Sequence, residues 1–150
     1  MKRLIIGLAA LAAILAGSSA ISGSDIDILV KGNHSAIKSM TMKDIHNQAD
    51  LDAFMATAFD KGHAPSLPTV DWTKQMVLVL FVGQQKYSGY QLRFTKVDDS
   101  GDSVQVSTKV VIPCSTHARV EDQQPFLIVA VPVSTKPVNF TDPEQDYQKC

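Results

Sequence analysis

The chain has little cysteine: only Cys114 and Cys150 occur among its 150 residues, and its four histidines are dispersed. Zinc sites need cysteines and histidines in pairs at short spacings, and that arrangement is missing. We therefore predict no metal site and no cofactor. In an exported chain two cysteines favour a disulfide, which would tie the C-terminal tail to the domain; two free thiols are the alternative. Such a bridge would contribute roughly 3–4 kcal/mol in the chain-entropy model.

The chain also lacks the short motifs of common catalytic sites. It has no nucleophile elbow, no glycine-rich phosphate loop and no His-Glu-x-x-His motif. Ser115, Thr116 and His117 stand together after Cys114, but sequence neighbours rarely have the geometry of a nucleophile and its base. The acidic turn Asp98–Asp102 lacks the alternating ligands and terminal glutamate of a calcium loop. We predict that the protein is not an enzyme, with a small enzyme built on these residues as a weaker alternative.

No stretch of the chain concentrates positive charge. Lysine and arginine total 14 against 15 acidic residues, which gives a formal net charge of −1 at pH 7. Without Lys2 and Arg3 the basic count falls from 14 to 12, and the formal charge moves from −1 to −3. Sequence-independent nucleic-acid binding needs clustered positive charge, so we predict no nucleic-acid partner.

Residues 1–20 have the three parts of a secretory signal peptide. Lys2 and Arg3 form the basic segment, Leu4–Ala16 is continuously apolar, and Ser18–Ala20 supplies small residues for cleavage. The apolar segment is short for a bilayer-spanning helix, so a retained membrane anchor is the weaker alternative. We predict that residues 1–20 are removed. Residues 21–150 would then form a single domain that is periplasmic or extracellular and has no stable membrane anchor.

Two continuous apolar runs, Met76–Val82 and Phe126–Val131, predict strands that are buried on both faces. Tyr90, Leu92 and Phe94 alternate with polar residues, which predicts a strand buried on one face and paired with the first run as a hairpin. We also expect strands at 25–30 and 104–110, an extended segment at 36–45 and a polar loop at 115–125. The tail after residue 136 is expected to be irregular unless the disulfide holds it.

One amphipathic helix is predicted over Gln48–Phe59, because its apolar residues recur three and four positions apart. Asn47 is a good N-cap, and Gly62 is available to end the helix. Trp72 is expected to cover one end of the core, with its indole N–H donating to a backbone carbonyl. One helix among many strands predicts an α+β domain: a mostly antiparallel sheet, arranged as a meander or like a sandwich, with the helix packed on it.

Short motifs surround the first apolar run. Leu67–Val77 carries the pattern Pro-x-Val-Asp-Trp before a strand, Gly83 follows that strand, and Ser88–Tyr90 forms a Ser-Gly-Tyr turn. Pro113–Cys114 comes later, as does the proline-flanked strand Pro125–Pro132, which Lys-Pro-Val at 136–138 follows. Together these motifs resemble the C-terminal domain of the PrcB family, most strongly over residues 48–140. The chain departs from that family in two places: Tyr87-Ser88-Gly89-Tyr90 lacks the threonine and first glycine of the Thr-Gly-Gly-Tyr turn, and no glycine directly precedes Cys114.

The resemblance implies an exported accessory subunit associated with a protease complex. We therefore expect a non-catalytic interaction module that binds or stabilises another envelope protein, with a protease as the partner class. The candidate partner-binding residues are those leading into and forming the turn: Gln85, Lys86, Tyr87, Ser88, Gly89 and Tyr90. Maintenance of the fold is the alternative role for Gly89 and Tyr90.

A small secreted peptidase inhibitor is the alternative function. Chagasin-like inhibitors of cysteine peptidases carry an Asn-Pro-Thr-Thr-Gly-[Tyr/Phe] loop. The segment Gln84–Tyr90 is similar in position and in its Gly-Tyr ending, but it lacks the Asn-Pro-Thr-Thr part. No second inhibitory loop is evident.

Overall fold

The computed structural model describes residues 25–150, and the predicted signal peptide at 1–20 lies outside the described residues. One helix and many strands make up this part of the chain, and most strand pairs are antiparallel, which confirms the predicted α+β class. The elements are β1 (Asp27–Gly32), β2 (Thr41–Ile45), α1 (Gln48–Ala58), β3 (Gln75–Phe81), β4 (Gln85–Tyr87), β5 (Gln91–Asp98), β6 (Val104–Ile112), β7 (Val120–Gln123), β8 (Phe126–Pro132), β9 (Val138–Phe140) and β10 (Glu144–Tyr147).

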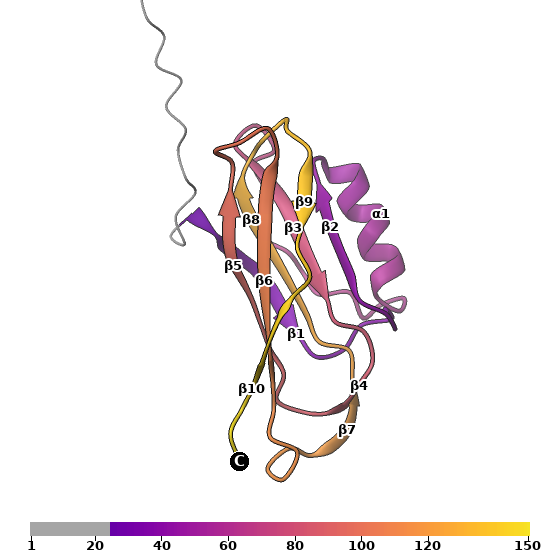
Figure 1. The fold of residues 1–150 in the computed structure, drawn as a ribbon. Coiled ribbons are helices and arrows are strands. Elements are labelled where there is room, and N and C mark those ends of the chain that lie inside the picture. The colour runs from indigo at the N-terminus through magenta and orange to yellow at the C-terminus, as the bar shows by residue number, and fades with distance from the viewer. Residues whose placement is uncertain (1–24) are drawn as a thin grey trace, which may run out of the picture.

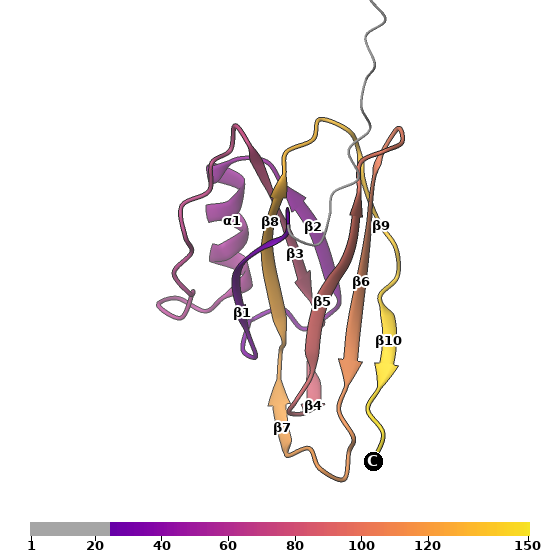
Figure 2. The ribbon, with the colours of Figure 1, turned by 90° about the vertical axis from the view of Figure 1, so that its left-hand side faces the viewer.

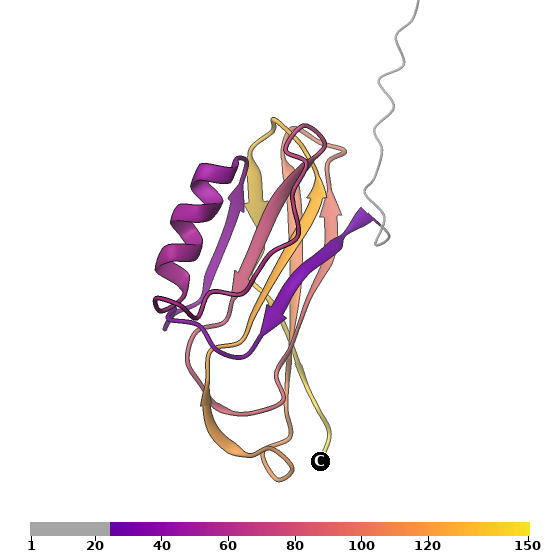
Figure 3. The ribbon, with the colours of Figure 1, turned by 180° about the vertical axis from the view of Figure 1, so that it is seen from behind.

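The strands form two main sheets that pack face to face, and α1 covers the outer face of one of them (Figures 1 and 2). The helix-backed sheet has the strand order β1-β8-β3-β2 and is antiparallel throughout. The outer sheet has the order β10-β6-β5, with β9 also pairing with β6. A separate two-stranded sheet, β4 with β7, lies at one end of the sandwich, near the C-terminus (Figures 1 and 3).

The central strand β3 is buried on both faces, as its continuous apolar run predicts. Val77, Val79 and Phe81 point towards α1 and belong to the helix-side core. The intervening side chains of β3 point the other way, into the core between the two sheets: Met76, Leu78 and Leu80. All six are fully buried, so this strand joins the two hydrophobic cores of the domain.

The predicted hairpin between the first apolar run and the strand at Tyr90–Phe94 is wrong. β3 pairs with β2 and β8, whereas β5 lies in the outer sheet and pairs with β6. A strand that is apolar on both faces needs cover on both sides, so the two continuous runs lie together in the middle layer. β5 alternates between polar and apolar residues, which suits an outer layer with one solvated face.

The helix begins where predicted and ends earlier. The Asn47 side chain accepts a hydrogen bond from the backbone N–H of Asp50 at 2.8 Å, which satisfies one free donor at the N-terminus. The helix ends at Ala58, so the prediction of a glycine-terminated end at Gly62 is wrong. Phe59 is extended because its ring packs in the core, 4.9 Å from the ring of Phe126, centroid to centroid.

The structure refines or corrects four further expectations. Only Thr41–Ile45 of the expected segment 36–45 is a strand, and the loop expected at 115–125 contains β7. The Trp72 indole N–H donates to the side-chain oxygen of Gln48 at 3.2 Å, not to a backbone carbonyl. The tail after residue 136 was expected to be irregular unless the disulfide held it. The disulfide is present, and β9 and β10 both run parallel to β6 along the same edge.

Candidate functional site

The predicted partner-binding residues, Gln85 to Tyr90, lie at the end of the sandwich in and beside the two-stranded sheet of β4 and β7, which we call the arm. Gln85 pairs with Gln123, and Tyr87 pairs with Val120. The backbone N–H of Ser88 donates to the Arg119 carbonyl at 3.0 Å. The Ser88 hydroxyl accepts from the Arg119 N–H at 3.1 Å. The segment expected as a loop is therefore held in one conformation by the second strand.

Two glycines turn the chain into and out of the arm. Gly83 has a φ of +83°, and a Cβ there would lie 2.6 Å from the carbonyl oxygen of Lys38. Gly89 has a φ of +97°, and a Cβ there would lie 3.3 Å from Pro113. Residues with a side chain rarely adopt such φ values. At Gly83 the neighbouring backbone also leaves no room for a Cβ atom. Gly83 therefore allows the chain to leave β3 and enter the arm instead of forming a tight hairpin.

The disulfide lies at the base of the arm and confirms the predicted pairing. Cys114 is bonded to Cys150, with the Cα atoms 5.4 Å apart, and Cys114 is buried. The turn after it is closed by the N–H groups of His117 and Ala118, which both donate to the Cys114 carbonyl. The strand β7 follows this turn directly, so the bridge fixes the start of the arm to the C-terminal tail.

The sequence neighbours Ser115 and His117 do not form a nucleophile–base pair in the described structure. The Cys114 sulfur is held in the disulfide and is not a free thiolate. Thr116 is the hydroxyl that contacts this sulfur, at 2.8 Å. Across residues 25–150, neither the Ser115 hydroxyl nor the His117 ring has a side-chain hydrogen-bond partner. Residues 25–150 also contain no group of three or more His, Cys, Asp and Glu side chains that could hold a metal ion.

Three tyrosines gather beside the arm. Tyr90 is half-buried, and burial raises the pKa of its phenol, with smaller contributions from the phenols of Tyr147 and Tyr87. Tyr147 projects from β10 and is 66% exposed, and Val120 projects from β7 and is 84% exposed. Tyrosine is enriched in protein interfaces because its ring buries a large apolar area while its hydroxyl stays hydrogen-bonded. Aromatic and apolar groups are therefore displayed together at this end of the domain.

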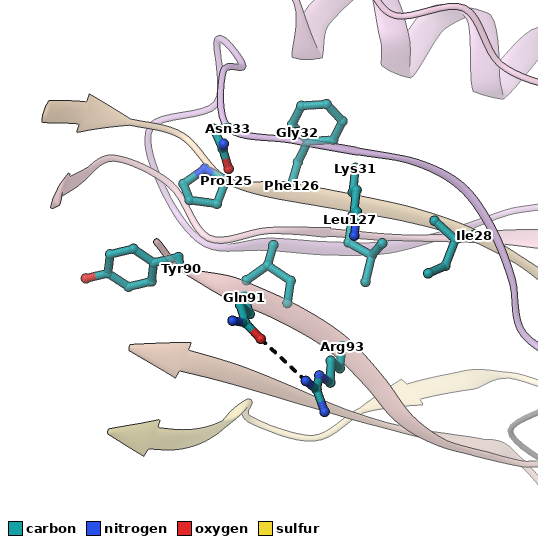
Figure 4. A pocket seen from close by; sticks show the side chains of 11 residues that line it. Ile28, Lys31, Gly32, Asn33, Tyr90, Gln91, Arg93, Pro125, Phe126 and Leu127 are labelled. Carbon is teal, nitrogen blue, oxygen red and sulfur yellow. Dashed lines mark hydrogen bonds between the residues drawn. The ribbon is translucent and has the colours of Figure 1, made fainter. Parts of the chain in front are cut away.

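Tyr90 also lines two hollows of the surface. One is a groove of about 550 Å³ between β1 and β5, which Figure 4 shows with Lys31 and Arg93 on its two walls. The other has a volume of about 460 Å³ and is lined by residues of the outer sheet, of β4 and of the tail, together with Met40 and Val82, which lie just outside β2 and β3. The ring of Tyr90 therefore links the arm to both hollows.

Comparison with protein-family models, with curated proteins and with solved structures finds no match for this chain. The resemblance to the PrcB family therefore stays a prediction. Within residues 25–150, no helix is long and apolar enough to cross a membrane.

Sequence reasoning missed several residues of this region. Val120 and Tyr147 lie in segments expected to be loop or tail, and no motif singled out Lys31 or Arg93. No local pattern indicates that β1 and β5 become neighbouring edges, because that depends on how the two sheets stack. The only available signal was the scarcity of tyrosine, since two of the chain's three tyrosines stand at Tyr87 and Tyr90.

Proposed function

We propose that this protein is an exported, non-catalytic binding module that holds another envelope protein at its arm. The observation that carries the proposal is the display of apolar surface on a fixed support: Val120 is 84% exposed on a strand that hydrogen bonds and a nearby disulfide hold in place. An ordered surface binds with a smaller loss of conformational entropy than a mobile loop does. The PrcB resemblance favours a protease complex as the partner.

The disulfide supports export. Disulfides form and persist in oxidising compartments and are rare in the cytosol. The bridge between Cys114 and Cys150 fits the signal-peptide pattern at residues 1–20, and both favour a periplasmic or extracellular location.

Site-specific crosslinking in the native cells tests the proposal. A photoreactive amino acid replaces the exposed Lys86 in the arm, and a matched variant carries it at the exposed Ala53 on α1. We expect a crosslinked protein from position 86 and none from position 53, and we expect Val120→Asp to weaken the crosslink by placing a charge in the apolar surface. Identification of the attached protein as a peptidase or its subunit would support the predicted partner class. Recovery of the uncrosslinked monomer alone from position 86 would contradict the proposal.

Inhibition of a peptidase is the second candidate function. The segment Gln84–Tyr90 is held by β7 and turned by Gly89, and a preorganised loop is what a tight inhibitor needs. Titration against papain-like and serine peptidases separates the two functions. Inhibition that Tyr87→Ala and Tyr90→Ala abolish would favour the inhibitor, and no inhibition at micromolar concentrations would end that hypothesis.

A further inference from the structure

The groove between β1 and β5 lies between two strand edges that have no partner in the described structure. β1 is the outermost strand of the helix-backed sheet, and β5 is the outermost strand of the outer sheet. The groove that they border has a volume of about 550 Å³, and residues 125–127, at the start of β8, complete its lining (Figure 4). An edge strand presents unpaired N–H and C=O groups, which can pair with another extended chain.

A bulge in β1 turns two side chains towards this groove. Ile28 is opposite Val129 and Lys31 is opposite Leu127, and the pairing shifts by one residue between them, at Leu29. Side chains that are directly opposite in a sheet share a face, and Val129 and Leu127 belong to the core between the sheets. Ile28 and Lys31 therefore both face the outer sheet. Ile28 is 60% exposed, so its apolar side chain is largely uncovered.

A second bulge, in β5, limits the length of the other edge. The pairing of β5 with β6 shifts between Phe94 and Lys96, so the regular free edge runs from Gln91 to Phe94. At about 3.3 Å per residue this edge spans about 13 Å, which suits a short extended segment. Leu92 packs against the core between the sheets, and Arg93 points away from it.

The groove is positively charged. Its lining contains Lys31 and Arg93 and no aspartate or glutamate. Over residues 25–150 neither cation forms an ion pair, and the Arg93 guanidinium only donates a 3.4 Å hydrogen bond to Gln91. The other lysines beside β5 and β6 differ, since Lys96 and Lys109 are each paired with carboxylates. Two unpaired cations on opposite walls favour a ligand that carries a carboxylate.

We propose that this groove binds a short, extended, acidic segment of the partner protein by strand addition to β5. The segment pairs with the backbone of residues 91–94 and places an apolar side chain against Ile28 and Leu92. Its carboxylates occupy the alternate positions, beside Arg93 at the rim of the groove, and the charge of Lys31 attracts them from the facing wall. This inference rests on the proposed function and names the chemistry of the partner. A second copy of the chain that added through its own β5 edge would bring residues 91–94, which include Arg93 and no carboxylate, to a groove that already holds two cations, and like charges on adjacent strands destabilise pairing.

A titration with defined peptides tests this assignment on the oxidised mature chain. The probe is a short peptide, capped at both ends, that alternates valine with glutamate, and amide chemical shifts report where it binds. We expect shift changes at residues 91–94 and at Lys31, and about tenfold weaker binding when glutamine replaces glutamate in the peptide, because charge-assisted hydrogen bonds are lost. N-methylation of alternate peptide nitrogens should abolish binding, because strand addition needs backbone donors.

Variants of the protein provide the matched controls. We expect Lys31→Gln and Arg93→Gln each to weaken binding of the glutamate peptide severalfold, up to about tenfold, and to leave the glutamine peptide unaffected. Lys61→Gln, at an exposed position beyond α1, should change neither. Equal affinity for both peptides, or no shift changes along β5, would overturn the proposal.

Two other results would also overturn it. Shift changes along β5 that depend on protein concentration alone would assign the groove to a second copy. The unsubstituted chain could also fail to bind the peptide while Arg93→Gln forms dimers. That result would show that the two cations prevent edge strands of two copies from pairing, and do not bind a ligand. A crosslink from position 86 without peptide binding in the groove would leave the proposed function in place and remove only this assignment.

Discussion

Cys150, the last residue of the chain, is bonded to Cys114, which lies just beyond the end of β6. The strands β9 and β10 lie between the two cysteines in sequence, and both pair in parallel with β6. Lys109 of β6 adds ion pairs to Glu144 and Asp146 of β10, at 3.1 and 3.8 Å. The tail is therefore held to one edge of the outer sheet by a ladder, two surface ion pairs and a covalent bond.

Removal of the disulfide should destabilise the domain. The bridge closes a loop of 36 residues, and the chain-entropy model gives about 3–4 kcal/mol for a loop of that length. We expect Cys150→Ser, combined with Cys114→Ser, to lower the free energy of unfolding in urea by roughly that amount. The reduced unsubstituted protein is the control, and it should unfold at the same urea concentration as the double variant. An unchanged midpoint would show that the bridge constrains only the tail.

Substitution of Gly83 tests the turn that sends the chain into the arm. Gly62 is the matched control, since its φ of +84° is nearly the same as the +83° of Gly83 but nothing lies within 4 Å of a Cβ there. We expect Gly62→Ala to cost about 1–2 kcal/mol, the price of a left-handed conformation alone. Gly83→Ala should cost about 1–3 kcal/mol more, because the new Cβ meets the Lys38 backbone. Equal losses in urea unfolding would remove the role assigned to this close approach.

Phe81 is the side chain whose truncation should be most costly in the helix-side core. It is fully buried, and its ring lies 5.3 to 6.0 Å, between centroids, from the rings of Phe54, Phe59 and Phe126. We expect Phe81→Ala to reduce the free energy of unfolding by about 3–5 kcal/mol through lost contacts and a residual cavity. Val120→Ala, at a position that is 84% exposed, should change it by less than about 0.5 kcal/mol.

The stability of the domain should depend on pH through Asp98. Hydrogen bonds from Ser100 and the ammonium of Lys96 hold the pKa of this carboxyl at about 2, below its ordinary value. A carboxyl with a lowered folded-state pKa contributes stability above the ordinary pKa of about 4 and loses it as the pH falls towards 2. We expect Asp98→Asn to destabilise the protein at neutral pH and to flatten the acid limb of its stability curve. Parallel curves for the two proteins from pH 6 to pH 2 would contradict this.

The main elements of the fold could be predicted because each has a local cause. A short continuous apolar run, such as Met76–Val82, favours a strand that is buried on both faces. The start of the helix is determined by one capping side chain, that of Asn47. Strand pairing has no local cause. One neighbour of β3 is β8, which lies far from it in the sequence. Proximity in sequence therefore wrongly favoured β5 as the partner of β3. The alternation along β5 was the available sign that it belonged to a layer with a solvated face.

The candidate site was predictable only in part. The sequence marked Gln84–Tyr90 as a polar loop and turn, whereas Gln85–Tyr87 within it is the strand β4. Its partner β7 consists of mostly polar residues with no strand period, and it forms because the turn after Cys114 directs it along β4. The groove between β1 and β5 depends on bulges at Leu29 and Thr95. A bulge moves the side chains that follow it to the other face of the sheet, and no pattern of residue types in the sequence indicates where it occurs.

The covalent bond between the last residue and the end of β6 also determines how the domain would respond to tension. A force that pulls on the two ends of an oxidised chain passes through the sulfur bridge from Cys150 directly to Cys114. Residues 115–149 then carry no load, and they include β8, at the centre of the helix-backed sheet. Only the segment that ends at β6 could be stretched, so a reducing agent would lengthen the extensible part of the chain.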